Sequence, residues 1–251
     1  MDFKSKHVVV SGGGSGVGAA IARSFAAAGA KVSVLGRRAA PLNDIAHDIG
    51  GAAFPCDVTD AAAVEQAVSN AREVKGPIAI TVANAGAAPS KPFSRMQPED
   101  LKASLDVNLC GVFHLWQATL PDMKDAGWGR LVAVASTAGL KGYPYVSAYC
   151  AAKHGVVGLT RSLAIELAQS GVTVNAICPG FIETPLLERS INNIVEKTGM
   201  SAEKAAKSLY QHNPQKRFIQ PDEVSETALW LCSDAARSVN GHTMTLSGGE
   251  I

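Results

Sequence analysis

Tyr149 and Lys153 are the two residues whose types and spacing point most directly to proton chemistry. They stand four positions apart in a segment with a helical pattern, so their side chains are expected on one helix face. A free phenol has a pKa of about 10, and an ammonium group beside it would lower that value by favouring the phenolate. The pair could therefore donate and accept a proton, although Tyr and Lys at this spacing also occur as ordinary surface neighbours.

Two further polar groups are expected near this pair. Ser136 follows the apolar run from Leu131 to Ala135, and Asn84-Ala85-Gly86 follows an earlier apolar run. Open α/β sheets bind their ligands at the carboxyl ends of their parallel strands. The hydroxyl of Ser136 could hold a substrate oxygen beside Tyr149, and Asn84 to Gly86 would border the same cleft.

A glycine-rich segment lies between the first expected strand and the first expected helix. Glycines let the backbone turn sharply and approach a pyrophosphate, whose charge then rests on the amides at the helix N-terminus. The alternative interpretation is a flexible turn, but the order of strand, loop and helix favours a dinucleotide-binding loop. The segment reads Ser11-Gly12-Gly13-Gly14-Ser15-Gly16-Val17-Gly18.

The end of the second expected strand bears on the choice between NAD and NADP. NAD sites of this kind usually carry a carboxylate there, which accepts hydrogen bonds from the ribose hydroxyls. This chain instead has Arg37 and Arg38, with no acidic residue close in sequence. A guanidinium group matches a phosphate dianion, so the sequence favours NADP(H) over NAD(H). Two solvated surface arginines are the alternative.

Taken together and in order, these segments resemble the short-chain dehydrogenase/reductase family. The resemblance covers almost the whole chain, and the spacing of 13 residues between Ser136 and Tyr149 selects Ser136 over Ser147 as the serine of the site. The matching pieces are Ser11 to Gly18, Asp57-Val58, Asn84-Ala85-Gly86, Asn108, Ser136, Tyr149 with Lys153, and Pro179-Gly180-Phe181-Ile182-Glu183-Thr184.

The resemblance implies a role for each matched residue. Tyr149 would protonate the carbonyl oxygen while hydride arrives from the nicotinamide, and Lys153 would depress the pKa of Tyr149 and hold the nicotinamide ribose. Ser136 would orient the carbonyl, and Asn108 would anchor a water that links Lys153 to bulk solvent. Further cofactor contacts are implied for the adenine at Asp57 and Val58, for the cleft at Asn84, Ala85 and Gly86, and for the carboxamide region at Pro179, Gly180, Ile182 and Thr184.

Three positions depart from the family pattern. Ser11 stands where the family usually has Thr, Ala83 replaces the first Asn of its N-N-A-G run, and Ala135 stands where a second Ser is common. None of these differences removes a catalytic group.

Short apolar runs alternate with helical patterns along the chain, which predicts a single α/β domain over residues 1–251. The fold expected is a doubly wound Rossmann sheet of seven parallel strands with helices on both faces. Strands are predicted at His7–Val10, Lys31–Leu35, Ala52–Pro55, Ile78–Val82, Gly129–Ala135, Val172–Ile177 and Thr243–Leu246. Helices are predicted at about Gly18–Ala28, Ala39–Ile49, Asp60–Val74, Pro98–Met123 and Ser147–Gln169, and after Pro221.

Composition excludes several classes of partner. Lys and Arg number 23 against 22 Asp and Glu, so the net charge of +1 gives no reason to expect nucleic acid or an anionic membrane. No signal peptide or transmembrane stretch is apparent, which makes the cytoplasm the default compartment. The five cysteines show neither zinc-ligand spacing nor a disulfide framework, and no metal is expected.

The substrate is expected to be a carbonyl compound or its secondary alcohol. Residues 185–216 would cover it, with Leu187, Ile191, Ile194 and Val195 at helical spacing. The catalytic helix is similar to those of 3-hydroxybutyrate dehydrogenases and 3-oxoacyl reductases, which favours a 3-oxoacyl thioester such as one of coenzyme A. A secondary-alcohol or polyol dehydrogenase is the alternative, and a non-catalytic dinucleotide-binding subunit is a third hypothesis. The resemblance also implies a homotetramer.

Several other polar and aromatic residues are not expected to take part in catalysis. His114 is expected to be a packed or interface histidine, His154 a residue of the helix surface, and Cys150 a small core or interface residue. Tyr143 and Tyr145 precede the catalytic helix and fit either a substrate pocket or loop packing.

Overall fold

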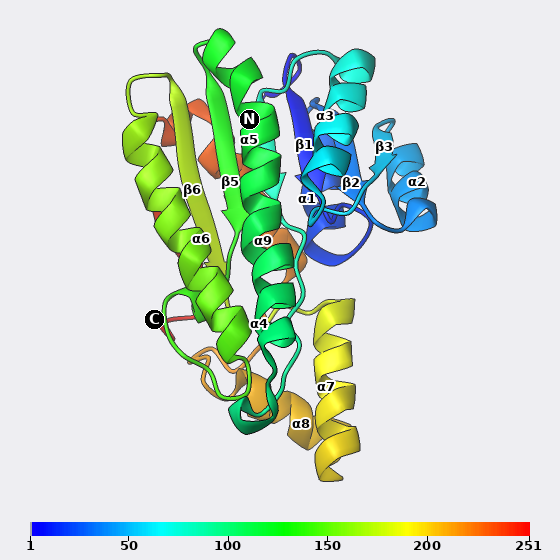
Figure 1. The fold of residues 1–251 in the computed structure, drawn as a ribbon, viewed down its shortest axis with the longest axis vertical. Coiled ribbons are helices and arrows are strands. Elements are labelled where there is room, and N and C mark those ends of the chain that lie inside the picture. The colour runs from blue at the N-terminus through cyan, green and yellow to red at the C-terminus, as the bar shows by residue number, and fades with distance from the viewer. Residues whose placement is uncertain (1) are drawn as a thin grey trace.

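The computed structural model describes residues 2–251 and contains one seven-stranded sheet in which every strand pair is parallel. The strand order is β3-β2-β1-β4-β5-β6-β7, which is the doubly wound arrangement expected from the sequence. The chain begins in the centre of the sheet, moves to one edge, returns and crosses to the other (Figure 1). The strands are β1 (His7–Ser11), β2 (Lys31–Gly36), β3 (Ala52–Pro55), β4 (Ile80–Ala83), β5 (Gly129–Val134), β6 (Val172–Pro179) and β7 (Thr243–Leu246).

Helices cover both faces of the sheet because its strands are apolar on both faces. Along β1, Val8 and Val10 belong to one apolar cluster and Val9 to another, as the alternation of side chains in a strand requires. The first cluster lies under α1 (Gly16–Ala27), α2 (Ala39–Asp48) and α9 (Pro221–Cys232). The second lies under α3 (Ala61–Lys75), α5 (Gly111–Asp125) and α6 (Ser147–Glu166). The prediction of helices on two faces is confirmed.

The long helix predicted at Pro98–Met123 is interrupted. The structure has α4 (Pro98–Leu105), a π-helical turn at Asp106–Cys110, and α5, which continues to Asp125. A π-turn inserts an extra residue into the helix and locally shifts the backbone hydrogen bonds, a feature often found at functional sites. Here it contains Asn108, whose side chain is buried and bonded to the strand-end segment after β4.

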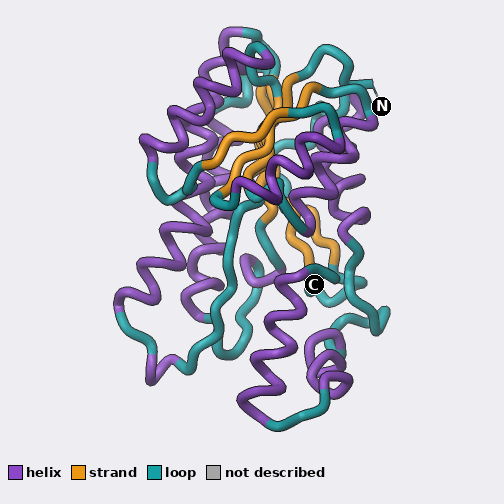
Figure 2. The backbone as a smooth tube through the Cα atoms, turned by 90° about the vertical axis from the view of Figure 1, so that its right-hand side faces the viewer, coloured by secondary structure: helices purple, strands orange, loops and turns teal. Residues whose placement is uncertain are grey.

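The segment expected to cover the substrate, residues 185–216, extends past the carboxyl edge of the strands. It contains α7 (Pro185–Thr198) and α8 (Ala202–Tyr210), drawn in yellow and orange at the bottom of Figure 1 and standing apart from the sheet in Figure 2. Short 3-10 turns complete the structure at Phe93–Arg95 (η1), Thr137–Gly139 (η3) and Asp234–Ala236 (η4). Within residues 2–251 no helix has the length and apolar character needed to span a membrane.

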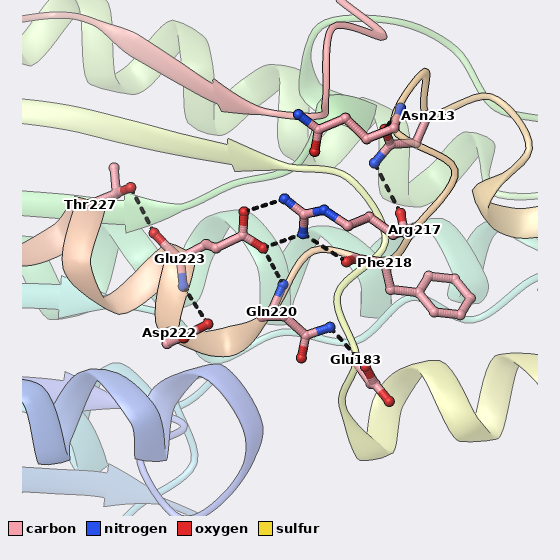
Figure 3. A network of polar contacts seen from close by, with 9 residues as sticks. Glu183, Asn213, Arg217, Phe218, Gln220, Asp222, Glu223 and Thr227 are labelled. Carbon is pink, nitrogen blue, oxygen red and sulfur yellow. Dashed lines mark hydrogen bonds and ion pairs between the residues drawn. The ribbon is translucent and has the colours of Figure 1, made fainter.

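The two ends of the covering segment are bound to each other. Ile219 N donates to Phe181 O and Glu183 N donates to Ile219 O, each at 2.9 Å, forming a parallel bridge between Ile182 and Ile219. The returning end is fixed in turn by Arg217, which donates to both carboxylate oxygens of Glu223 at 2.6 and 2.8 Å (Figure 3). The segment thus enters and leaves the fold at one fixed point.

Candidate active site

Tyr149 and Lys153 lie on one face of α6, as their spacing predicts. The Lys153 Nζ atom is 5.7 Å from the centroid of the Tyr149 ring and donates a hydrogen bond of 2.9 Å to the carbonyl oxygen of Val134, at the end of β5. Lys153 is 3% exposed and Tyr149 is partly buried. The ammonium group is therefore held beneath the phenol at the carboxyl edge of the sheet.

The pKa values of this pair differ from the expectation. Burial raises the pKa of Tyr149 to about 12, against a smaller opposing effect of the Ser136 hydroxyl, and burial lowers the pKa of Lys153 to about 8. The pKa of Tyr149 is thus raised, and not lowered as the neighbouring Lys153 led us to expect. The physical reason is that desolvation penalises the charged form of both groups, while the ammonium is directed at Val134 O.

Ser136 stands between β5 and the turn η3. Its hydroxyl oxygen accepts a hydrogen bond of 3.1 Å from Ala138 N, which fixes the side chain as the cap of that turn. The same hydroxyl interacts with the Tyr149 phenol and favours its ionised form. Ser136, Tyr149 and Lys153 therefore meet at one point, where an oxygen atom of a substrate could receive hydrogen bonds from two hydroxyls.

Asn108 is fully buried behind Lys153. Its Oδ1 accepts from Ala87 N at 3.1 Å, and its Nδ2 donates to Ala87 O and Ser104 O at 2.9 and 3.0 Å. Gly86 lies between the two residues, since a Cβ atom added there would be 2.8 Å from Asn108 Oδ1 and 3.8 Å from Lys153 Nζ. The Asn108 side chain is thus bonded to protein groups and holds the segment after β4, while its role as a water anchor stays a prediction.

The glycine loop has the close backbone packing that a phosphate-binding turn requires. A Cβ atom on Gly18 would lie 2.2 Å from Gly12 O, and Gly12 itself has a left-handed φ of 65°. Helix α1 begins at Gly16 and has no acidic residue in its first turn, so its N-terminal amides can donate hydrogen bonds to an anion. These features fit a bound dinucleotide pyrophosphate.

Ser11 and Asn84 join the glycine loop to the end of β4. The Ser11 hydroxyl oxygen accepts from Asn84 N and Ala85 N at 3.0 and 3.1 Å, and Asn84 Nδ2 donates to Ser11 O at 3.0 Å. Ser11 is 2% exposed. The Ser11 and Asn84 side chains therefore hold the glycine loop in place against the end of β4.

The two arginines after β2 have different surroundings. Arg38 extends to the glycine loop, where its NH2 group lies 3.5 Å from Ser15 Oγ, whereas Arg37 NH1 lies 4.0 Å from Asp57 Oδ2. The sequence has no acidic residue near these arginines, but the fold brings Asp57 beside one of them. Arg38 and Ser15 together form the better candidate for contact with a ribose phosphate.

Asp57 and Val58, the expected adenine contacts, form a firmly bonded turn. Asp57 Oδ1 accepts from Thr59 N and Thr59 Oγ1 at 3.0 and 2.9 Å, and these hydrogen bonds lower the pKa of Asp57. The ring of His114 on α5 is bonded to Val58 O at 3.0 Å. His114 is therefore a packed, partly buried residue that supports this turn, as expected.

The segment after β6 approaches the glycine loop from the other side. Gly180 N donates to Leu246 O at 3.0 Å, which ties the segment to β7, and Thr184 Oγ1 donates to Ile182 O at 3.2 Å. The Thr184 methyl group would lie 3.4 Å from a Cβ atom on Gly16. The structure thus places the expected carboxamide contacts across from the expected pyrophosphate contacts.

Tyr143 and Tyr145 are separated by the fold. Tyr143 OH lies 2.8 Å from Thr137 Oγ1 and 3.0 Å from Glu250 Oε1. Burial and the Glu250 carboxylate raise the pKa of Tyr143 far above its ordinary value, against an opposing effect of the Thr137 hydroxyl. Tyr145 is 64% exposed with a left-handed φ of 67°. Sequence reasoning did not single out Glu250; its only signal was the Gly248-Gly249 pair, which allows the chain to turn back before it.

No group of three or more His, Cys, Asp or Glu residues within 2–251 is arranged to hold a metal ion. The five cysteines are all free. The chemistry available at the carboxyl edge of the sheet is therefore that of two hydroxyls, one buried amine and a loop suited to a dinucleotide.

Fold and site together define an oxidoreductase with a dinucleotide-binding sheet. The family model described as enoyl-(acyl carrier protein) reductase matches residues 12–250, and the chain belongs to the short-chain dehydrogenase/reductase family. The chain is 38% identical to a D-beta-hydroxybutyrate dehydrogenase of Cupriavidus necator, covering 98% of each chain. It is 35% identical to a D-threitol dehydrogenase of Mycolicibacterium smegmatis, covering 99% of this chain and 94% of the relative.

A solved structure agrees closely with this fold. A variant of actinorhodin polyketide ketoreductase with NADPH superimposes with a TM-score of 0.94 at 32% sequence identity, covering 100% of this chain and 99% of the other. The resemblance inferred from the sequence motifs is thus confirmed at the level of family and fold.

Proposed function

We propose that this protein transfers a hydride between NADP(H) and a carbonyl/secondary-alcohol pair, with Tyr149 as the general acid and base. The observation that carries the proposal is the meeting of Tyr149, Ser136 and Lys153 at the carboxyl edge of the sheet. NADPH, when bound, would supply the hydride for reduction, and NADP+ would accept it in oxidation. The residues of the chain bind, orient and move the proton.

Each residue of the site has a distinct task in this proposal. The Tyr149 phenol donates its proton to the carbonyl oxygen during reduction and accepts it back during oxidation, while Ser136 Oγ orients the same oxygen. Lys153 supports the phenolate and holds the nicotinamide ribose. Asn108 keeps the segment behind Lys153 in place and serves as the water anchor. The cofactor is held by the glycine loop, Arg38, Asp57-Val58 and the segment from Pro179 to Thr184.

The arginines yield a prediction about the cofactor. Arg38→Ala is expected to raise the Kd for NADPH about tenfold or more and to leave that for NADH nearly unchanged, because one charge-assisted contact is worth roughly 1.5–3 kcal/mol. Arg37→Ala is the matched comparison and should have the smaller effect, since Arg37 lies toward Asp57. Fluorescence titration with both cofactors measures this, and a wild-type protein that binds NADH more tightly would contradict the NADP(H) proposal.

We propose a 3-oxoacyl thioester, such as a coenzyme A ester, as the substrate. Leu187 on α7 is buried, and Ile191, Ile194 and Val195 on the same helix are partly buried, so this face could cover an acyl chain. Lysines of the covering segment could attract phosphates of the carrier arm, although Glu188, Glu196 and Glu203 dilute this charge. The named relatives include a D-beta-hydroxybutyrate dehydrogenase and a polyketide ketoreductase.

The substrate proposal is tested by comparing catalytic efficiencies. Acetoacetyl-CoA, a longer 3-oxoacyl thioester, free acetoacetate and a cyclic ketone of similar size are offered with NADPH, and the loss of NADPH absorbance is followed. The thioesters are expected to give the highest kcat/KM. A clear preference for the cyclic ketone would contradict the thioester proposal.

A polyol or other secondary-alcohol dehydrogenase is the second candidate, favoured by the similarity to a D-threitol dehydrogenase. Oxidation of polyols with the oxidised cofactor would distinguish this second candidate from a reductase of 3-oxoacyl thioesters.

We further propose a single-domain, cytoplasmic homotetramer that binds neither nucleic acid nor membrane and needs no metal. The exposed Leu101 on α4 and Phe113 on α5 support a contact between copies, and sedimentation analysis tests the assembly.

A further inference from the structure

A buried carboxylate lies between two segments that border the active site. The Glu250 side chain is 7% exposed, and its Oε1 accepts from Lys141 Nζ at 2.5 Å and from Tyr143 OH at 3.0 Å. Its Oε2 would be 3.9 Å from a Cβ atom on Gly180, at the start of the expected carboxamide segment. Glu250 therefore contacts the loop that follows Ser136 and also lies close to the segment that follows β6.

The hydrogen bonds around Glu250 have a defined direction. A carboxylate only accepts, so Tyr143 must donate its single hydroxyl proton to Glu250. Thr137 Oγ1, 2.8 Å away, must then donate to Tyr143 OH. Thr137 directly follows the catalytic Ser136, and the Tyr143 ring packs edge-on against Phe181 with centroids 6.2 Å apart. The carboxylate of Glu250 is thus linked through the hydrogen bonds of Tyr143 to Thr137, which is the neighbour of Ser136 in the chain.

Lys141 is the cation that this carboxylate compensates. It lies on the loop between η3 and α6, so it stands between Ser136 and Tyr149 in the chain. Lys91, on the neighbouring loop, is likewise paired with a carboxylate, that of Asp100, and its backbone N–H donates to Tyr145 O at 2.7 Å. An uncompensated lysine beside the site would attract anionic substrates, whereas these paired lysines offer them little net attraction.

We propose that Glu250 is a specificity-determining residue, which neutralises Lys141 and thereby favours uncharged carbonyl groups, such as those of esters and thioesters, over free 3-oxo acids. The inference rests on the proposed carbonyl reductase activity and narrows its substrate class. Glu250 acts on the substrate through charge and through the position of Tyr143, without touching the reacting atoms.

The test uses Glu250→Gln in the full-length enzyme. Glutamine keeps an oxygen acceptor for Tyr143 and removes the negative charge, which leaves Lys141 uncompensated. Acetoacetate and its ethyl ester form a charged and an uncharged pair of substrates. We expect the wild type to prefer the ester, and the variant to shift the ratio of the two kcat/KM values about fivefold toward the acid, mainly through KM for the acid.

Two further variants separate charge from structure. Lys141→Met removes the cation and should shift the ratio toward the ester, and the double variant Lys141→Met/Glu250→Gln should lose the gain for the acid. Asp48→Asn, which breaks the exposed pair with Arg23 far along the chain, is the matched control and should leave the ratio unchanged. NADPH affinity and thermal unfolding confirm that each variant is folded.

Equal changes in kcat/KM for the acid and the ester in Glu250→Gln would overturn the proposal, as would a wild type that prefers the acid. If the wild type reduces neither acetoacetate nor its ethyl ester but reduces another ketone, the proposed 3-oxo substrate class is wrong. That ketone and its carboxylated analogue then serve as the uncharged and the charged substrate in the same comparison. If no carbonyl is reduced, the proposed function fails and this inference fails with it.

Discussion

Tyr149→Phe is expected to lower kcat by a factor of about 100 or more while leaving the Kd for NADPH nearly unchanged. The substitution removes the hydroxyl that carries the proton and keeps the ring and the rest of α6. Because burial raises the pKa of Tyr149 to about 12, the phenol is protonated at neutral pH and ready to act as an acid in carbonyl reduction. Steady-state kinetics and a fluorescence titration of NADPH measure the two effects separately.

Tyr143→Phe is the matched control for this prediction. Tyr143 is also partly buried, and its hydroxyl is hydrogen-bonded to Thr137 and Glu250 rather than interacting with Ser136. Its loss should lower kcat far less than that of Tyr149. Near-normal turnover in Tyr149→Phe would refute the assignment of the proton donor, and an equal loss in both variants would indicate a general disturbance of the site.

Lys153→Met is expected to lower turnover by about 100-fold or more and, in the cofactor-free protein, to raise the free energy of unfolding at pH 7 by roughly 1–3 kcal/mol. In the proposed mechanism the ammonium of Lys153 binds the ribose and supports the phenolate. The same group is 3% exposed, and burial lowers its pKa from 10.5 to about 8, so the folded state bears a cost for holding the charge. Methionine fills a similar volume without that charge.

The pH dependence of the stability gain in Lys153→Met shows whether the gain comes from removing the buried charge. Between pH 8 and 10.5 the unfolded chain binds more protons at Lys153 than the folded chain does, so this residue's contribution to stability rises with pH in that window. The advantage of Lys153→Met should therefore shrink as the pH rises from 8 to 10.5. Urea unfolding at several pH values measures it, and a variant less stable than the wild type at pH 7 would contradict the argument.

The fold was predictable because the strands are apolar on both faces and end at turn residues. The ranges for β3 and β7 agree with the structure, and those for the other strands differ by one or two residues at their ends. The interruption of the long helix was not predictable, since Asp106–Cys110 has the composition of ordinary helix and the π-turn depends on the tertiary bonds of Asn108. Local pattern alone contains no information about such bonds.

For the site, sequence spacing correctly predicted that Tyr149 and Lys153 share a helix face and that Ser136 lies beside them. It could not predict that Asp57 approaches Arg37 or that Glu250 lies beneath Tyr143, because these contacts join residues 20 and 107 positions apart in the chain. The raised pKa of Tyr149 could not be predicted from the sequence either, because the burial of its side chain depends on tertiary packing.

The bridge between Ile182 and Ile219 has a consequence for how such enzymes diversify. Since the chain leaves and re-enters the body of the protein at one hydrogen-bonded point, residues 185–216 can change in length and composition without displacing Ile182 or Ile219. Thr184 and the glycine loop would keep their spacing after such an exchange. A segment of another length could therefore replace residues 185–216 and present a different surface to the substrate, while Tyr149 and Lys153 keep their places on α6.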